Sequence, residues 1–360
     1  MVTLIAPEYP ENCQSDIEII RIPSKKLPFD PEDRLMSLAR VKGLLPKLEK
    51  KRFDVVHIQT PFVAHYGGVY LAKKLGLPSV VSYHTYFEAY FEKYLPWLPH
   101  FLLRGIARRF SASQCNQVDG VISPSNQMLG KLREYGTKTE ARVIPTGLKL
   151  NQYKMKGESS FRQNHGISKD DQVLLYVGRV AHEKNIPFLM DVFVEVFEQN
   201  NNAKLVIAGE GPAHKALKNR AKVLDMEENI IFVGYLDRET ELIDCYHSAD
   251  VFVFSSETET QGLVLLEAMA CNLPVVSVAS MGSKDVLIDK QGCLIANLEI
   301  NEFSEKVIKL LTEPEYASRI AKAGVAYVGN WSTEDKAQEL LDFYQSVMRR
   351  RQQETIAVAT

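Results

Sequence analysis

Two glutamates with seven residues between them lie where a strand-like run passes into a helix-like run. Glu259 belongs to a polar segment that follows the run VFVF, and Glu267 lies inside the apolar run LVLLEAMA. A helix that begins near Gly262 would present the backbone N–H groups of Thr260, Gln261 and Gly262 at its positive end, where hydroxyl and phosphate oxygens bind. An ionised carboxylate in an apolar helix needs a polar partner. We therefore expect Glu267 to meet either a ligand hydroxyl or, as a purely structural alternative, a basic side chain.

A second group of polar residues follows the run VLLYV, at Gly178, Arg179 and Lys184. Two cations at this point would suit a diphosphate, because they would stabilise the negative charge of a departing leaving group. An exposed basic loop is the plainer alternative. A tight turn with little side-chain bulk follows another strand-like run. It consists of Gly209, Glu210 and Gly211.

The N-terminal half offers two further candidate features. His84 ends the run SVVSYH and would project from a strand end, although a lone histidine is more often structural. Segment 99–112 carries Arg104, Arg108 and Arg109 on a helical pattern. The apolar stripe of that pattern consists of Leu102, Ile106 and Phe110. The pattern predicts either a core-packed helix with a solvated basic face or a patch that contacts anionic lipid headgroups.

Two other enzyme classes use some of these residue types. A glycosidase needs two carboxyl groups about 5–10 Å apart, and the sequence leaves that distance open for Glu259 and Glu267. Glu267, however, lies more than one turn inside its helix, which suits it to hold a fixed hydroxyl. A dinucleotide-dependent oxidoreductase needs a strand that runs into G-x-G-x-x-G with an acidic residue about 20 positions later, and the sequence lacks that pattern.

Short β-branched runs alternate with amphipathic stretches along the chain, which predicts two doubly wound parallel α/β units. We expect an N-terminal Rossmann-like domain over 1–150, a linker over 151–171, and a second such domain over 172–330. Residues 331–360 are expected to form a helix that returns toward the N-terminal domain, followed by a tail. Met1 leads directly into a strand and a Pro-rich loop, so the N-terminal domain is expected to lack its first βα unit.

The composition narrows the function classes. With 360 residues, 45% apolar and 24% charged, the chain is long enough for two globular cores. A formal net charge of −2 predicts no general attraction to nucleic acid. Five scattered cysteines and the lack of a long apolar run or signal peptide predict a cytoplasmic protein that is neither secreted nor integral to a membrane. The arginine-bearing segment would allow peripheral contact with the inner face of a membrane.

Glu259 and Glu267 resemble the E-x7-E motif of retaining family 4 glycosyltransferases, which have two Rossmann-like domains facing a cleft (the GT-B fold). Other segments fall where that family has its counterparts: Gly178-Arg179 with Lys184-Asn185, Gly209-Glu210-Gly211, Ile144-Pro145-Thr146-Gly147 and Trp331-Ser332. The variant TETQGLVLLEAMA, together with YHTYFEAY near 83, is similar to glycolipid-forming members such as diacylglycerol glucosyltransferases and sulfoquinovosyl-lipid enzymes.

The resemblance implies transfer of a hexose from a UDP-sugar to a hydroxyl, with a membrane lipid such as diacylglycerol as the acceptor and no metal or cofactor beyond the co-substrate. It implies that Arg179 and Lys184 bind the donor diphosphate and that Glu267 binds the ribose. Glu259 and the amides after it would hold the sugar, while His84 would face the transferred hexose. The expected catalytic groups are thus His84, Glu259 and the two cations. The alternative is an impaired donor-binding or scaffold protein derived from such an enzyme.

Overall fold

The computed structural model describes residues 2–9, 16–27, 30–88, 99–154 and 159–359. Its C-terminal half is built on a six-stranded sheet in which all neighbouring strands pair in parallel. The strands are β9 (Gln172–Val177), β10 (Ala203–Ala208), β11 (Ile230–Gly234), β12 (Val251–Phe254), β13 (Val275–Val278) and β14 (Cys293–Ala296). Their spatial order is β11-β10-β9-β12-β13-β14. The chain thus reverses its direction of travel across the sheet between β9 and β12, which is the place where such sheets bind ligands.

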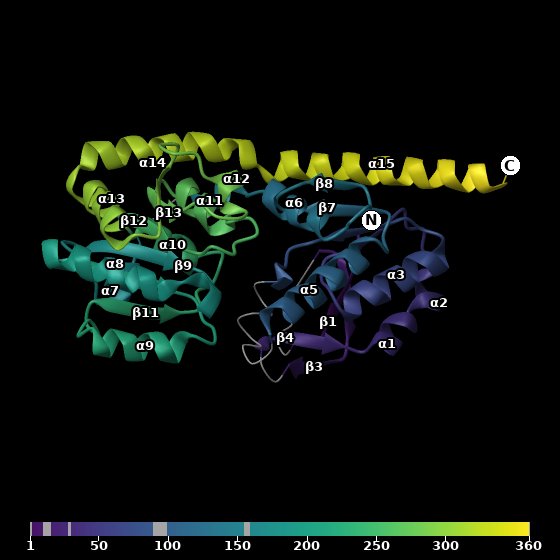
Figure 1. Cartoon of the computed structure of the whole chain (residues 1–360), viewed down its shortest axis with the longest axis horizontal. Coiled ribbons are helices and arrows are strands. Elements are labelled where there is room, and N and C mark those ends of the chain that lie inside the picture. The colour runs from purple at the N-terminus through teal and green to yellow at the C-terminus, as the bar shows by residue number, and fades with distance from the viewer. Residues whose placement is uncertain (1, 10–15, 28–29, 89–98, 155–158, 360) are drawn as a thin grey trace.

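Helices line both sides of this sheet (Figure 1). The principal ones are α8 (Ile186–Gln199), α9 (His214–Val223), α10 (Glu241–His247), α11 (Leu263–Ala270), α13 (Ile300–Thr312) and α14 (Pro314–Val328). Shorter elements are η1 (Leu150–Tyr153), α7 (Phe161–Asn164), η2 (His182–Lys184), α12 (Ser283–Val286) and η3 (Gly329–Trp331). Helices α8 and α13 contact each other and both contact β12, whereas α11 packs against α14.

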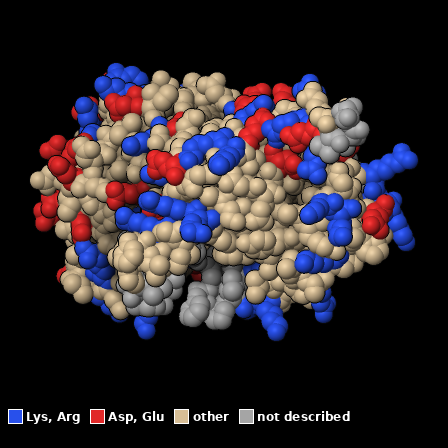
Figure 2. Space-filling view, turned by 45° about the vertical axis from the view of Figure 1, so that its right-hand side comes forward, with Lys and Arg blue, Asp and Glu red and all other residues tan. Residues whose placement is uncertain are grey.

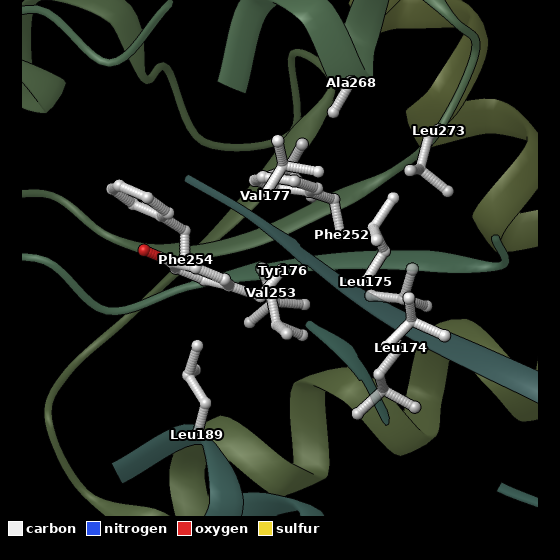
Figure 3. Close-up of a cluster of buried hydrophobic side chains, with 14 of the residues drawn as sticks. Leu174, Leu175, Tyr176, Val177, Leu189, Phe252, Val253, Phe254, Ala268 and Leu273 are labelled. Carbon is white, nitrogen blue, oxygen red and sulfur yellow. The ribbon is translucent and has the colours of Figure 1, made fainter. Parts of the chain in front are cut away.

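The central strands are buried on both faces, which explains why their sequences are continuous apolar runs. Every residue of β12 is buried, and so are the last five residues of β9. The rings of Tyr176 and Phe254 stack with their centroids 5.9 Å apart and an interplanar angle of 8°. Figure 3 shows these two rings in one buried cluster that also contains Leu174, Val177 and Phe252. A rigid base therefore supports the loops that leave β9 and β12.

The N-terminal half contains a four-stranded parallel sheet in the order β5-β6-β7-β8. Its strands are β5 (Val56–Ile58), β6 (Ser79–Ser82), β7 (Gly120–Ser123) and β8 (Ala141–Val143). Two smaller sheets precede it, namely a parallel pair of β1 (Thr3–Pro7) and β2 (Glu18–Ile22) and an antiparallel pair of β3 (Ser24–Leu27) and β4 (Asp30–Met36). The helices are α1 (Leu38–Lys42), α2 (Leu45–Leu48), α3 (Val63–Leu75), α5 (His100–Cys115) and α6 (Asn126–Glu134). That this half lacks a first βα unit stays a prediction.

The last helix, α15 (Thr333–Ala359), leaves the C-terminal half and runs along the N-terminal half (Figure 1). Phe343 and Val347 on this helix pack against Val80 and Ile122 of the four-stranded sheet. A side chain at Gly120 would collide with them, because its Cβ would lie 2.9 Å from Val347. Ser332 caps the helix, as its hydroxyl oxygen accepts a hydrogen bond from the Asp335 N–H at 3.1 Å.

The architecture confirms the expected α/β fold with two parallel sheets. Among the described residues, no helix is both long enough and apolar enough to cross a membrane. Figure 2 shows basic side chains at several places on the visible face with acidic ones between them, so the charge on this face is mixed.

Candidate functional site

The loops that follow β9 and β12 bring two of the expected site residues into contact. Lys184 ends η2 after β9, and its Nζ lies 2.7 Å from Oε2 of Glu259, which follows β12. Each side chain is 18% exposed. The pair therefore stands at the point where the sheet reverses, partly shielded from water. A cation and a carboxylate this close together can bind a phosphate and a sugar hydroxyl in neighbouring positions.

The glycines of the two neighbouring loops allow their backbones to touch. Gly209 has φ 130°, and a Cβ at this position would lie 2.0 Å from the carbonyl oxygen of Gly178. Gly211 has φ 153°, and its Cβ would lie 2.4 Å from the carbonyl oxygen of Val180. Backbone hydrogen bonds join the same loops, from Gly178 N to Ala208 O at 3.0 Å and from Val180 N to Glu210 O at 2.8 Å. The Arg179 and Glu210 loops thus form one rigid wall beside Lys184.

Glu267 is 1% exposed and accepts hydrogen bonds from three side chains. Its Oε1 accepts from Arg238 at 2.7 Å and from the Tyr153 hydroxyl at 3.2 Å. Its Oε2 accepts from the Tyr246 hydroxyl at 2.9 Å. Burial, together with the nearby negative charge of Glu267, raises the pKa of both tyrosines, so they stay protonated donors. The structure thus shows the pairing with a basic side chain that the sequence allowed, although the Arg238 side chain is 59% exposed and borders solvent.

Sequence reasoning missed these three partners. Arg238 follows the end of β11, so the rule that ligands bind beyond strand ends would have found it. Tyr153 and Tyr246 lie in helical segments without a comparable signal.

The loop between Glu259 and α11 turns sharply at Gly262, whose φ is 89°. The carbonyl oxygen of Glu259 accepts from Gly282 N at 2.7 Å, and that of Thr260 accepts from the Ser125 hydroxyl at 2.8 Å. The Gln261 side chain forms hydrogen bonds with the backbone N–H and carbonyl oxygen of Thr146. Residues of the N-terminal half therefore bind this loop directly.

His84 follows β6 and is exposed. Partial desolvation lowers its pKa, and its ring contributes to the low pKa of His57 on β5. Among the hydrogen bonds and ion pairs of the described residues, none links His84 to Lys184 or Glu259. The structure therefore joins Lys184 and Glu259 of the C-terminal half and leaves His84 on the other sheet.

Helix α5 presents its apolar residues differently from the expectation of a core stripe at Leu102, Ile106 and Phe110. Leu102 is 45% exposed and Ile106 is 50% exposed, while Phe110 is half-buried. The buried face is offset by one position and includes Leu103, Ala107 and Ser111. Of the two alternatives that the sequence left open, the core-packed stripe is therefore wrong, because a helical period does not specify which face meets the core.

The arginines of α5 have unequal surroundings. Arg108 donates to Glu88 at 2.7 Å, and the Nε of Arg104 lies 3.8 Å from the same carboxylate. Burial alone would raise the pKa of Glu88, but hydrogen bonds from Arg108 and Tyr135 outweigh it and lower the pKa. Glu88 therefore anchors Arg108 to the protein, whereas Arg109 is exposed on the helix surface.

Comparison with known proteins adds to this geometry. Residues 1–152 match the model of Glycosyltransferase Family 4, and residues 158–327 match that of glycosyl transferases group 1. The alpha-monoglucosyldiacylglycerol synthase of Streptococcus pneumoniae is 32% identical over 332 residues, which cover 84% of this chain and 73% of that protein. The chain belongs to glycosyltransferase family 4. It is a retaining hexosyltransferase that takes its sugar from a nucleotide-sugar.

Two further comparisons, one of sequence and one of structure, extend the range of proteins that this family 4 glycosyltransferase resembles. The sulfoquinovosyl transferase SQD2 of Arabidopsis thaliana is 28% identical over 300 residues, which cover 80% of this chain and 56% of that protein. The crystal structure of HepE from Anabaena in complex with UDP-glucose superposes with a TM-score of 0.75 at 17% identity, covering 92% of this chain and 86% of that one. At this identity the likeness establishes the shared fold.

Proposed function

We propose that this glycosyltransferase moves a hexose from a UDP-sugar to the hydroxyl of a membrane lipid such as diacylglycerol. The observation that carries the proposal is the contact between Lys184 and Glu259 at the reversal point of the C-terminal sheet. The UDP-glucose complex of HepE and the diacylglycerol acceptor in the name of the pneumococcal relative support the choice of donor and acceptor.

The proposed donor site includes the rigid wall formed by the Arg179 and Glu210 loops. Arg179 and Lys184 bind the diphosphate and stabilise the negative charge left on it as the bond to the sugar breaks. Glu259 binds hydroxyls of the sugar, and Glu267 binds the ribose once Arg238, which borders solvent, gives up part of its contact. His84 faces the hexose from the N-terminal half. In this division, residues 172–330 hold the donor and residues 1–150 hold the acceptor.

The exposed surface of helix α5 supports the choice of a lipid as the acceptor. Phe101 is 79% exposed, and together with Leu102 and Ile106 it forms an apolar surface beside Arg104 and Arg109. Apolar side chains that enter a bilayer surface next to arginines that attract anionic headgroups are typical of peripheral membrane proteins. We infer that this surface brings the acceptor site to the cytoplasmic face of the membrane.

The test is a transfer assay with the purified chain. UDP-glucose, UDP-galactose and GDP-mannose are each offered with vesicles that contain diacylglycerol, and the product is analysed by mass spectrometry and for its anomeric configuration. We expect a hexosyl-lipid with the donor's configuration from a UDP-sugar. UDP binding without any transfer would instead favour a donor-binding scaffold. A product made from GDP-mannose, or from a soluble acceptor alone, would contradict the proposed substrates.

A further inference from the structure

The side chain of Gln261 joins the donor loop to the N-terminal half. Its Oε1 accepts a hydrogen bond from Thr146 N at 2.9 Å, and its Nε2 donates to Thr146 O at 2.8 Å. The residue is 6% exposed. Both the oxygen and the nitrogen of the amide thus bind the backbone of the same residue. If the side chain rotates or Thr146 shifts, at least one of the two hydrogen bonds is strained.

Thr146 lies next to the place where the two halves are covalently joined. Two residues later, Leu148 N donates to Trp331 O at 2.7 Å, and Thr333 N donates to Leu148 O at 3.0 Å. The segments 147–149 and 331–333, which we call the junction, thus run side by side. A Cβ at Gly147 would lie 2.7 Å from the carbonyl oxygen of Ser332, so the junction is tightly packed.

The loop that Gln261 belongs to has a second attachment. The Ser125 hydroxyl at the start of α6 donates to the carbonyl oxygen of Thr260 at 2.8 Å. A Cβ at Gly282 would lie 2.0 Å from that same oxygen, so the loop has little room to move toward α12. Glu259 therefore lies one residue from a loop segment that the N-terminal half holds at two points.

We propose that Gln261 is a positioning residue that couples the relative orientation of the two halves to the placement of Glu259 beside the donor sugar. Gln261 does not touch the reacting atoms in this scheme. Its hydrogen bonds make the loop follow the junction, so that Glu259 is correctly positioned for the sugar when the N-terminal half is in its catalytic orientation. The proposal rests on the proposed donor site, since it assigns Glu259 to the sugar.

The test compares Gln261→Met, Gln261→Glu and the surface control Gln291→Met. Gln261→Met keeps the side-chain length and loses both hydrogen bonds. We expect it to leave the UDP dissociation constant within about 2-fold of the wild type, because the diphosphate and ribose contacts remain. The value of kcat should fall about 10-fold to 100-fold, the range for misplacing a contact to the reacting substrate. A parallel loss of UDP affinity and kcat, or an unchanged kcat, would overturn the proposal.

Gln261→Glu provides a readout that a merely structural role would not move. An ionised carboxylate would repel Thr146 O, whereas a protonated one can donate to it, and burial favours the protonated form. Relative to the wild type, kcat of Gln261→Glu should therefore recover as the pH falls from about 8 to about 6, and that of Gln261→Met should not. A pH profile parallel to that of Gln261→Met would contradict the assignment.

A measurement without substrate separates this inference from the proposed function. Single-molecule energy transfer between dyes on the two halves should show a broader distance distribution in Gln261→Met than in the wild type or in Gln291→Met. Unaltered distributions would refute the coupling. This readout holds even for a wild type that transfers no sugar, an outcome that would refute only the proposed function.

Discussion

Lys184 and Glu259 form an ion pair of 2.7 Å between the loops that follow β9 and β12. The amine that the proposed mechanism gives to the diphosphate is therefore already neutralised by the carboxylate that it gives to the sugar. A binding diphosphate has to compete with Glu259 for Lys184. When it succeeds, the carboxylate becomes available to the sugar hydroxyls.

This competition predicts that two substitutions affect UDP binding differently. Lys184→Ala should weaken UDP by about 1.5–3 kcal/mol, the range for one charge-assisted hydrogen bond. Glu259→Gln should leave UDP affinity equal or higher, while it lowers kcat with the whole donor. Calorimetry with UDP and steady-state kinetics would measure both effects. The exposed pair of Lys222 and Glu227 provides matched control substitutions, and equal losses of UDP affinity in the two site variants would contradict the competition.

Glu267 should matter for stability as well as for binding. Glu267→Gln removes the charge that three donors share, so we expect the free energy of unfolding to fall by about 1–3 kcal/mol and UDP to bind more weakly. Tyr246→Phe removes one donor and should cost about 1 kcal/mol. Denaturant unfolding followed by fluorescence would measure both. A Glu267→Gln variant as stable as the wild type would show that the charge of Glu267 contributes nothing net to stability.

The helix α5 surface should bind anionic vesicles. Arg109→Ser and Arg104→Ser should each weaken binding by about 1 kcal/mol at low salt, and Ile106→Ser should weaken it at all salt concentrations because the apolar contact is not screened. Sedimentation with vesicles of phosphatidylglycerol and phosphatidylcholine would show this. Arg319→Ser on α14 is the control. Because Arg108 is held by Glu88, its replacement should lower stability too. Binding that ignores salt and all α5 variants would remove the surface from the proposal.

The sequence predicted the parallel sheets and the loops of the site because both depend on local patterns. Apolar runs such as VFVF identify central strands, and the residues just after them lie at one edge of the sheet. That rule places Lys184 and Glu259 at the same edge, but their ion pair was not predicted. The partners of Glu267 did not follow, because Tyr153, Arg238 and Tyr246 reach it from three separate segments. For α5 the sequence left two alternatives, a core-packed stripe or a lipid-contacting patch, because helical periodicity leaves the orientation of a helix open.

His57 predicts a loss of stability at mildly acidic pH. Burial and the neighbouring His84 ring lower the pKa of His57 from 6.5 to about 4, and its ring nitrogens contact the hydroxyls of Tyr344 and Ser82. The folded protein therefore prefers the neutral ring. This contribution to the free energy of unfolding is complete above pH 6.5 and is lost as the pH falls toward 4. At pH 5 the loss amounts to about 2 kcal/mol. His57→Gln should reduce the pH dependence of unfolding between pH 7 and 5, and the same change at exposed His182 is the control. A dependence that stays the same in His57→Gln would assign it to other groups.

The packing of helix α15 determines which segments can be exchanged between related enzymes without disrupting an interface. Phe343 and Val347 complete the core of the four-stranded sheet although they follow the whole C-terminal half in the chain. A chimaera that joins one parent's residues 1–150 to another parent's remainder would therefore combine a sheet with a foreign helix. Exchanges that transfer residues 1–147 and 333–359 together keep this interface native, and they replace the N-terminal half while the C-terminal sheet and its loops stay unchanged.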